Sequence, residues 1–329
     1  MNKEILVFRT DRIGDLLLTC PTIKTIKQSL PGHKITIITS DKNYLYSKTF
    51  DFFDNIYVYP KKNILKKIKL FVKLYKKKFD KIFIFDGKDR SILLSCLLKS
   101  KSKTSKVTTK KQSYLCKLFR IKYSFDVFGK NLNEVHQKLL NYAGIEDKIA
   151  NFDYLKSKKD NFFASKIPFS DYIHIHLDEK WFSSTYIKSY ENINPGYEEF
   201  INFVNKISDK NNTLITTGLK KNNLIDLLEI NALKKIHDNI HINNYKNNIA
   251  VVIQPTFLDL ESILRKSKIL ITCHGAITHV AASLNVKIFD IVEKSSDKLV
   301  SRYSLYINNY YKLYRKSFKY LVQDLNQLL

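Results

Sequence analysis

Glycine, cysteine and long apolar runs are scarce in this 329-residue chain, and each shortage excludes a class of protein. The 4 cysteines stand far apart with no C-x-x-C pair, so the sequence predicts neither a zinc site nor a disulfide framework. The longest apolar run, Ile92–Leu98, is far shorter than the ~18 residues that a membrane-spanning helix needs. The first apolar run, Ile5–Phe8, ends at Arg9, so we expect no secretory signal peptide and a cytoplasmic location.

Acidic residues are also in short supply. The chain has 31 Asp and Glu against 56 Lys and Arg, which gives a formal net charge of +25. Such an excess is compatible with nucleic acid, an anionic membrane surface or an acidic small molecule as partner. Only 7 of the basic residues are arginine, which is favoured for bidentate phosphate recognition, and abundant Lys, Asn and Ile are typical of an AT-rich genome. We therefore expect no nucleic-acid partner and keep the other two alternatives.

Short β-rich runs alternate with helical patterns along the chain, which favours parallel sheets covered by helices. The predicted strands are Glu4–Phe8, Lys34–Ser40, Asn55–Tyr59, Lys81–Asp86, Ser105–Thr109, Asp171–Leu177, Thr213–Gly218, Ile249–Ile253, Lys268–Thr272 and Val286–Val292. The predicted helices are Asp15–Leu30, Ile64–Tyr75, Asn133–Tyr142, Tyr197–Ile207, Asn222–Ile236 and Leu258–Lys266. The polar stretch Leu155–Pro168 is the best candidate linker, so we predict two Rossmann-like α/β domains, 1–160 and 161–329.

The stretch RTDRIGDLLL, residues 9–18, joins the first predicted strand to the first predicted helix. Open α/β sheets bind ligands at the carboxyl ends of their strands, so this stretch lies where a ligand is expected. We interpret Gly14 as the residue that lets the chain turn sharply off the strand. Asp15 is either an ordinary acid at a helix start or an ionised carboxylate that serves as general base for a hydroxyl nucleophile.

Neither a G-x-G-x-x-G fingerprint nor a P-loop is present, so dinucleotide oxidoreductases and P-loop NTPases lose support. Glycines do follow later strands. Gly218 and Gly275 stand where a Cβ would obstruct a turn or a ligand, whereas we assign Gly87 to ordinary turn chemistry.

Segments in both halves resemble glycosyltransferase family 9, the lipopolysaccharide heptosyltransferase group. ILVFRTDRIGDLLLTCPTIKTIKQSLPGHKITIIT resembles the family's strand, R-x-x-x-x-G-D turn, helix with T-x-P, and second strand. In the second half, IHIHLDEKWFS resembles its strand followed by a K-W pair. LDLESILRKSKILITCHGAITHVAASLNVKIFDI resembles its L-x-E-L helix, strand, small-residue turn and following helix. The resemblance covers both predicted domains in the right order.

This resemblance implies a GT-B fold, with two facing Rossmann-like domains, mainly parallel sheets and an interdomain cleft. It also implies transfer of a sugar with inversion, from a nucleotide-diphosphate donor to a saccharide, without a metal or another cofactor. Asp15 matches the acid that deprotonates the acceptor hydroxyl. Other residues of the same loop would line the acceptor side: Thr10, Asp11, Arg12 and Gly14.

On the donor side, the resemblance matches Lys180 to a lysine that contacts the donor phosphates. The other residues that it implies for donor binding are Gly218, Cys273, His274, Gly275, Ala276 and His279. The chemistry is consistent with this, because departure of a nucleotide diphosphate builds negative charge. Without Mg²⁺, cationic side chains and N–H groups at a helix N-terminus must meet that charge.

The sequence departs from the family pattern at the late turn. Cys273 and His274 stand where the family commonly has an acid followed by Ser or Thr, and the spacing from Gly275 to His279 is one residue longer. The loop Leu219–Asn223 also lacks the acid that the family brings to the nucleotide ribose. The donor sugar is therefore left open between heptose and another sugar.

Four other features have competing interpretations. His174 and His176 share one strand face, but no third ligand is apparent, so no metal site is predicted. Trp181 either packs in the core or flanks the site. The amphipathic stretch Lys61–Phe79 predicts a sheet-covering helix or one that lies on an anionic membrane. The similar stretch Tyr310–Leu325 predicts a packed last helix, with a membrane surface as the alternative, and the resemblance to GT-B folds implies that this helix packs back on the first domain.

We interpret the sequence as a glycosyltransferase that modifies a cell-surface or lipopolysaccharide-type saccharide, free or lipid-linked, in the cytoplasm or on the inner face of its membrane. Two alternatives stay open. A nucleotide-sugar epimerase of the same fold should carry more acids and histidines around the donor. A non-catalytic basic protein would bind nucleic acid or glycan, but the retention of Gly14, Asp15 and Lys180 argues against it.

Overall fold

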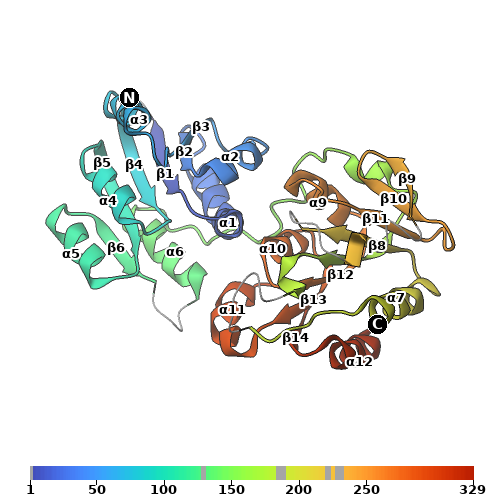
Figure 1. Ribbon diagram of the computed structural model, residues 1–329. Helices are drawn as coiled ribbons and strands as arrows, with labels where there is room; N and C mark the ends of the chain where they lie inside the picture. The colour runs from blue at the N-terminus through green and yellow to red at the C-terminus, as the bar shows by residue number, and fades with distance from the viewer. Residues whose placement is uncertain (1–2, 127–130, 183–189, 219–223, 227–232) are drawn as a thin grey trace. The chain divides into compact units, whose positions relative to one another are not determined.

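Two compact units, Met1–Tyr154 and Leu155–Leu329, make up the protein (Figure 1). The computed structural model describes residues 3–126, 131–182, 190–218, 224–226 and 233–329. Each unit contains its own β-sheet with helices on both faces, and most strand pairs are parallel. The predicted α/β class with two Rossmann-like sheets is confirmed.

The first unit is built on a parallel sheet of six strands in the order β3-β2-β1-β4-β5-β6. Its strands are β1 (Glu4–Arg9), β2 (Lys34–Thr39), β3 (Asn55–Val58), β4 (Lys78–Ile84), β5 (Lys99–Val107) and β6 (Lys122–Phe125). Its helices are α1 (Ile13–Ser29), α2 (Asp41–Ser47), α3 (Ile64–Tyr75), α4 (Asp89–Cys96), α5 (Lys110–Leu118) and α6 (Leu132–Tyr142). In this doubly wound order, the chain builds outward from β1 to β3 on one side of the sheet and from β4 to β6 on the other. The order therefore reverses between β1 and β4, although the two strands are parallel.

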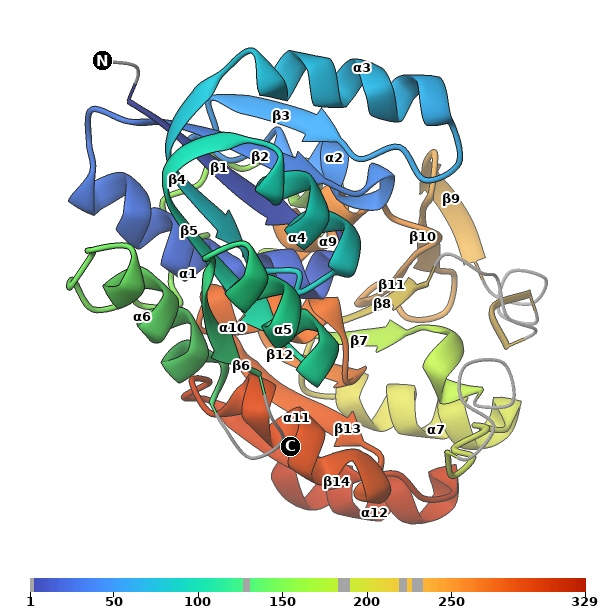
Figure 2. The ribbon, with the colours of Figure 1, turned by 90° about the vertical axis from the view of Figure 1, so that its left-hand side faces the viewer.

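The helices of the first unit divide between the two faces of its sheet. Leu6 and Phe8 of β1 face a core that also contains buried side chains of α3, α4 and α5. On the opposite face, Phe85 contacts the ring of His136 in α6, and Thr22 of α1 hydrogen-bonds that ring at 3.0 Å. Figures 1 and 2 both show α3, α4 and α5 together on one side of this sheet.

The second unit contains an eight-stranded sheet in the order β14-β13-β12-β7-β8-β11-β10-β9. Its strands are β7 (Tyr172–Leu177), β8 (Thr213–Thr217), β9 (Leu233–His237), β10 (Ile240–Asn243), β11 (Ile249–Val252), β12 (Ser267–Cys273), β13 (Lys287–Val292) and β14 (Tyr310–Tyr314). Six strands repeat the parallel order of the first unit, with the reversal between β7 and β12. The hairpin of β9 and β10 extends one edge by antiparallel pairing.

Helices cover this second sheet and bury one main core. They are α7 (Tyr197–Ser208), α9 (Phe257–Leu264), α10 (Ala276–Ser283), α11 (Asp297–Ser304) and α12 (Phe318–Leu328), with short 3-10 helices η1 (Phe163–Lys166), η2 (Glu179–Trp181) and η4 (Lys294–Ser296). Phe318, Leu321 and Leu325 of α12 pack in the core beside Phe200 and Phe203 of α7. The last helix thus packs within the second unit.

Local sequence signals explain where several helices begin. The Asn63 side chain accepts a hydrogen bond from the Lys66 amide at 2.9 Å and so caps α3. Thr109 and Gln112 form a reciprocal capping box at the start of α5. Such caps satisfy N–H groups that have no partner inside the helix.

Two predicted helices are corrected. Within Asn222–Ile236, residues 224–226 are helical, residues 222–223 and 227–232 lie outside the described residues, and Leu233–Ile236 belongs to strand β9. Tyr310–Leu325 is not one helix, because Tyr310–Tyr314 pairs with β13 in parallel before α12 begins. In both places, pairing with a neighbouring strand overrides a helical spacing of apolar residues.

The polar stretch Leu155–Pro168, predicted as a linker, lies in the second unit and packs on α9. The Lys158 ammonium contacts the buried Glu261 carboxylate at 2.5 Å, and the Ala164 amide donates to the Ser262 hydroxyl at 3.0 Å. The segment therefore contributes contacts to the second unit. Within the described residues, no helix combines the length and the apolar character needed to cross a bilayer.

The two sides of α3 should differ sharply in their contribution to stability. Leu74 is fully buried under the helix and Leu65 is 66% exposed on its outer side. We expect Leu74→Ala to lower the free energy of unfolding by about 2–5 kcal/mol, and Leu65→Ala by less than about 0.5 kcal/mol. Urea unfolding of both variants measures this. Equal losses would contradict the assignment of the two faces.

Candidate functional site

In the first unit, chemically active side chains gather where the strand order reverses. Arg9 is the last residue of β1. Asp86 comes shortly after β4, the strand that pairs with β1 at the reversal. Ligands of open α/β sheets bind at the carboxyl ends of strands at such a reversal. The loop Thr10–Arg12 and the first turn of α1 lie at the same edge.

A buried arginine organises this edge. The Arg9 side chain has no exposed surface, and its Nε donates to the Asp15 carbonyl at 2.8 Å while Nη1 donates to the Phe85 carbonyl at 2.5 Å. Its guanidinium also lies 3.2 Å from an Asp11 carboxylate oxygen and 3.6 Å from one of Asp15. A buried cation needs such partners, so Arg9 fixes both carboxylates relative to the strand.

Asp86 holds the other side of the loop. Its Oδ2 accepts hydrogen bonds from the hydroxyls of Thr10 at 2.6 Å and Ser91 at 2.7 Å. Arg90 donates to the Thr10 hydroxyl at 2.9 Å, and its guanidinium lies over the ring of Tyr59 at 4.9 Å. Thr10 is predicted to line the acceptor side, but its side chain is buried. Its hydrogen bonds with Asp86 and Arg90 instead fix the conformation of the loop.

The proposed base and its neighbours lie in the first turn of α1. The Asp15 side chain is 35% exposed, and its Oδ2 accepts from the Arg12 amide at 3.3 Å. The prediction that Gly14 makes the sharp turn is wrong. Gly14 is inside α1 without a positive φ, and Thr10–Arg12 make the turn. Gly87 does adopt φ +56°, as expected for an ordinary turn glycine.

Asp11 is the most perturbed carboxyl of this edge. Its backbone carbonyl is held by Ser40 at 2.9 Å and Asn43 at 3.1 Å. Burial is the main cause that raises the pKa of Asp11 to about 6, where the charge of Arg9 lowers this pKa and the carboxylates of Asp15 and Asp86 raise it. Within the described residues, its Oδ1 is buried without a hydrogen-bond partner. A carboxyl with this pKa can exchange a proton near neutral pH.

In the second unit, the strand reversal brings together residues from β7 and β12. Lys180, on η2 after β7, donates from Nζ to the carbonyls of Cys273 at 3.1 Å and His274 at 3.0 Å. The same ammonium lies 2.7 Å from the Asp178 carboxylate. The predicted lysine and the predicted late turn therefore meet, directly before the N-terminus of α10 at Ala276.

Two glycines allow this close approach. A Cβ on Gly275 would lie 2.5 Å from Lys180 Nζ, so the missing side chain leaves room for the ammonium. A Cβ on Gly218 would lie 2.9 Å from the Cβ of Asp178 and 3.2 Å from its Cα. Gly218 thus lets the loop after β7 pack against the end of β8. The expectation about Leu219–Asn223 lies outside the described residues.

Cys273 is a buried thiol held beside a buried arginine. Burial raises the pKa of Cys273, so the thiol stays protonated at neutral pH. Arg315 Nη1 lies 3.5 Å from its sulfur, and Nη2 donates to the Lys180 carbonyl at 2.7 Å. Glu293 lies 3.9 Å from Arg315 Nε and supplies an opposite charge. Cys273 therefore acts as a packing residue of the turn and offers no thiolate.

His274 is paired with a carboxylate from the neighbouring strand. Its Nδ1 lies 2.6 Å from Oδ2 of Asp290, which is fully buried on β13. The same oxygen accepts from the Tyr310 hydroxyl at 2.8 Å. The His274 side chain is 19% exposed, so part of it remains accessible to solvent. Asp290 thus places a fully buried carboxylate directly behind the turn.

His279 lies behind His274. Its ring centroid is 5.6 Å from that of His274, and its Nδ1 is 2.6 Å from the Tyr306 hydroxyl. Burial lowers the pKa of His279 well below its usual range, which keeps the imidazole neutral. It can support His274 by contact between the two rings.

The histidines of β7 form a separate buried pair. His174 and His176 both hydrogen-bond the Thr216 hydroxyl, at 2.7 and 2.8 Å. Burial, together with the positive charge of Lys180, lowers the pKa of His176 to about 3. Trp181 is fully buried and packs on Phe318. Among the described residues, no three His, Cys, Asp or Glu side chains cluster as a metal site would require.

Several residues of both edges escaped the sequence analysis. Asp86 is the last residue of a predicted strand and Asp178 follows one directly, which is the signal that could have identified them. Asp290 interrupts the apolar run VKIFDIV, where a buried acid indicates a specific partner. Arg315 gives no such signal, because it stands in a run rich in Lys and Tyr.

The stability of the protein should depend on pH through Asp11. Because the native state raises the pKa of Asp11 from 3.8 to about 6, it binds this proton more tightly than the unfolded chain does. The associated stability is present below pH 4 and is lost as pH rises through 6. We expect Asp11→Asn to be more stable than the wild type at pH 8, by up to roughly 3 kcal/mol.

The advantage of Asp11→Asn should vanish below pH 4, which urea unfolding across this pH range can follow. Asp51→Asn is a matched control, because Asp51 is exposed in the same unit. Equal stability of Asp11→Asn and the wild type at pH 8 would show that Arg9 fully compensates the carboxylate.

The two site glycines should respond differently to a methyl group. Gly275→Ala opposes only the flexible end of Lys180, so we expect a loss below about 1 kcal/mol in the free energy of unfolding. Gly218→Ala opposes the Asp178 backbone and should cost about 1–3 kcal/mol. Chemical denaturation compares the two. A larger loss for Gly275→Ala would refute this account of the Lys180 contact.

Known structures resemble the chain over nearly its whole length. The E. coli heptosyltransferase WaaC with ADP is 14% identical with a TM-score of 0.70, covering 99% of this chain and 100% of that chain. A glycosyl transferase of family 9 from Veillonella parvula is 16% identical with a TM-score of 0.68, covering 99% of this chain and 90% of that chain. The UDP-GlcNAc 2-epimerase of Methanocaldococcus jannaschii is 13% identical with a TM-score of 0.56, covering 98% and 92%.

No protein-family model and no curated protein sequence matches the chain. At these identities the likeness concerns the fold. The chain has the two-domain, Rossmann-like GT-B fold of the family 9 structures, as the resemblance of its motifs predicts.

Proposed function

We propose that the protein is an inverting, metal-independent glycosyltransferase that uses a nucleotide-diphosphate sugar. The observation that carries this proposal is the contact of Lys180 with the turn before α10 at the strand reversal of the second sheet. A cation beside a helix N-terminus at such a reversal is an arrangement that suits a diphosphate. WaaC, which shares the fold, was solved with ADP.

The donor phosphates would replace some of the present partners of the Lys180 ammonium. Its ammonium now contacts two carbonyls and the Asp178 carboxylate. A diphosphate placed before Ala276 would offer oxygens to this ammonium and to the first amides of α10. His274 is partly exposed at the same turn and would contact a phosphate or the sugar.

Asp15 would act as general base on the acceptor. Its carboxylate takes the proton of an acceptor hydroxyl, whose oxygen attacks the anomeric carbon as the bond to the diphosphate breaks. The diphosphate leaves with the bonding electron pair, and attack from the opposite face inverts the anomeric centre. Asp15 is suited to this because it is partly exposed and is held by Arg9 and the Arg12 amide.

The neighbouring loop residues would shape the acceptor side. Asp11 and Arg12 lie in the turn directly before Asp15. The acceptor is proposed to be a saccharide of a cell-surface or lipopolysaccharide-type glycan, modified at the cytoplasmic side. The donor sugar is heptose or another sugar, because Cys273 and His274 replace the acid and hydroxyl expected at the turn.

A thermal-shift screen against ADP, UDP, GDP, CMP and their sugar conjugates tests the donor site. One nucleotide diphosphate should stabilise the wild type, by about 2.7 kcal/mol at a concentration 100 times its Kd. Lys180→Ala should abolish most of this shift, whereas Lys210→Ala, an exposed lysine of the same unit, should retain it. A screen in which no nucleotide shifts the melting temperature would remove the support for the donor site.

Asp15→Asn then separates binding from catalysis. This variant should keep the nucleotide shift and lose sugar transfer by about 10²–10⁴-fold. The measurement follows a labelled sugar from the stabilising donor to a panel of truncated lipopolysaccharide cores. Wild-type transfer by Asp15→Asn would exclude it as the base, and epimerised free sugar nucleotide would favour the epimerase alternative.

A further inference from the structure

The outer sides of α3, α4 and α5 expose many large apolar side chains. These helices share one side of the first sheet, and their inner sides are buried by residues such as Leu70, Leu74 and Ile92. Figure 2 shows the three helices on the face turned to the viewer. Their exposed apolar residues, each more than 40% exposed, are Ile64, Leu65, Ile68, Val72, Tyr75, Leu93, Leu97, Tyr114, Leu118 and Phe119.

We call these ten residues and the lysines among them the α3–α5 surface. Large apolar residues scattered singly are ordinary on a protein surface, but a group on one side of one sheet is not. Ile64 and Leu65 are 64% and 66% exposed, and Tyr114 on α5 is 67% exposed. The apolar side chains are therefore available to a partner.

The same surface is strongly basic. Residues 61–79 contain nine lysines and no acid, and of these Lys61 pairs with Asp41 and Lys77 with Glu4. On α5, Lys110, Lys111 and Lys117 continue this charge, and Asp89 of α4 neutralises only Lys111, at 2.9 Å. The positive charge thus accompanies the apolar residues across more than one helix.

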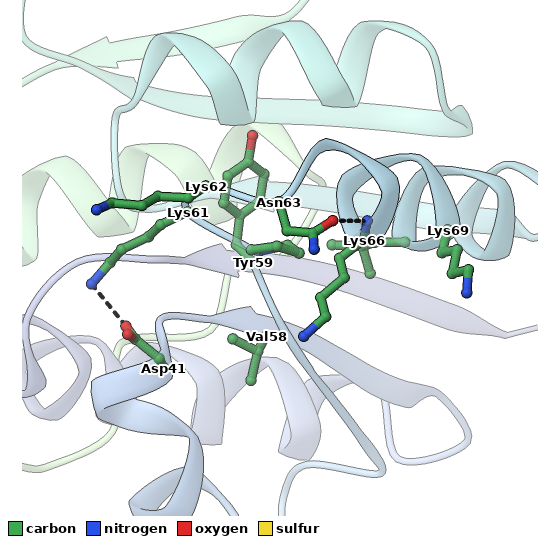
Figure 3. A pocket seen from close by; sticks show the side chains of 10 residues that line it. Asp41, Val58, Tyr59, Lys61, Lys62, Asn63, Lys66 and Lys69 are labelled. Carbon is green, nitrogen blue, oxygen red and sulfur yellow. Dashed lines mark hydrogen bonds and ion pairs between the residues drawn. The ribbon is translucent and has the colours of Figure 1, made fainter.

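A lysine-lined hollow lies at the start of α3. It has a volume of about 640 Å³, and Figure 3 shows Lys62, Lys66 and Lys69 at its edge. Within it, Lys61 pairs with Asp41 at 2.9 Å. Tyr59 also lines this hollow and carries the Arg90 guanidinium over its ring. Because Arg90 hydrogen-bonds Thr10, the hollow adjoins the loop that leads to Asp15.

We propose that the α3–α5 surface docks on an anionic lipid bilayer. Exposed Ile, Leu and Tyr side chains can enter the boundary between headgroups and acyl chains, while lysines beside them reach the lipid phosphates. Lysines are the only charged residues in the segment 61–79, and their attraction to anionic lipid acts over a long range. Four of the five exposed apolar residues of α3 are aliphatic (Ile64, Leu65, Ile68 and Val72), which favours insertion into lipid over the stacking of RNA bases on aromatic rings.

Docking in this way brings the bilayer to the side of the first sheet that contains the lysine-lined hollow, and Tyr59 and Arg90 connect this hollow to Thr10 in the loop that leads to Asp15. A lipid-linked acceptor would be presented at the same surface. The docking surface itself rests on none of the donor-site assignments, so membrane binding can be tested without any nucleotide or sugar.

Vesicle flotation of the full chain tests the proposal. The wild type should bind vesicles of phosphatidylcholine with 30% phosphatidylglycerol and bind pure phosphatidylcholine vesicles much more weakly. The apolar triple variant, Ile64→Gln with Leu65→Gln and Ile68→Gln, should lose about tenfold or more in partitioning. The basic triple variant, Lys62→Gln with Lys66→Gln and Lys69→Gln, should lose at least as much.

A charge-matched control distinguishes a docking surface from the general attraction of a chain with net charge +25. Lys206→Gln with Lys210→Gln and Lys234→Gln removes the same charge from exposed positions of the second unit and should bind vesicles like the wild type. All three variants should keep the wild-type melting temperature within a few degrees, because every changed side chain is exposed.

Three results would overturn the proposal. Equal losses in the control and basic variants would show non-specific charge attraction. Unchanged partitioning of the apolar variant would show that no apolar insertion occurs at α3. Absence of vesicle binding, with salt-sensitive binding of single-stranded RNA that the basic variant abolishes, would assign the surface to nucleic acid.

Discussion

The reversal of strand order in each sheet is the constraint on which both candidate sites depend. Two strands that are neighbours at a reversal send their connections in opposite directions, so their carboxyl ends are left open. In the first unit this exposes the ends of β1 and β4, where Arg9 and Asp86 hold the loop to Asp15. In the second it exposes the ends of β7 and β12, where Lys180 meets the Cys273–Gly275 turn.

Charge compensation then fixes the geometry of the first edge. Arg9 is buried, and a buried guanidinium without partners would be far more costly than one that holds two carboxylates and two carbonyls. The arrangement is asymmetric, because Asp15 remains partly exposed whereas burial raises the pKa of Asp11 to about 6. One carboxylate is left accessible for chemistry, and the other resists ionisation.

How much the sequence predicts depends on whether a signal is local. The Arg9–Asp15 loop was identified because strand, turn and helix follow one another in a single stretch. The His274–Asp290 pair was not, because the two residues lie on different elements and Asp290 sits inside an apolar run that indicates only a core strand. Strand β14 was missed for a related reason, since its pairing with β13 is a tertiary contact that the helical spacing of Tyr310–Leu325 does not reveal.

At the second edge, each basic side chain already has a carboxylate partner. Lys180 contacts Asp178, His274 contacts Asp290, and Arg315 lies near Glu293, so each basic group has a carboxylate from the same sheet edge. These pairs let a set of buried and half-buried basic residues fold together without mutual repulsion. A diphosphate would therefore bind by competition with those carboxylates. The contacts of its roughly four acceptor oxygens with Lys180 and with the N-terminal amides of α10 must be stronger than the contact of Lys180 with Asp178. A doubly charged diphosphate meets this requirement better than a single carboxylate would.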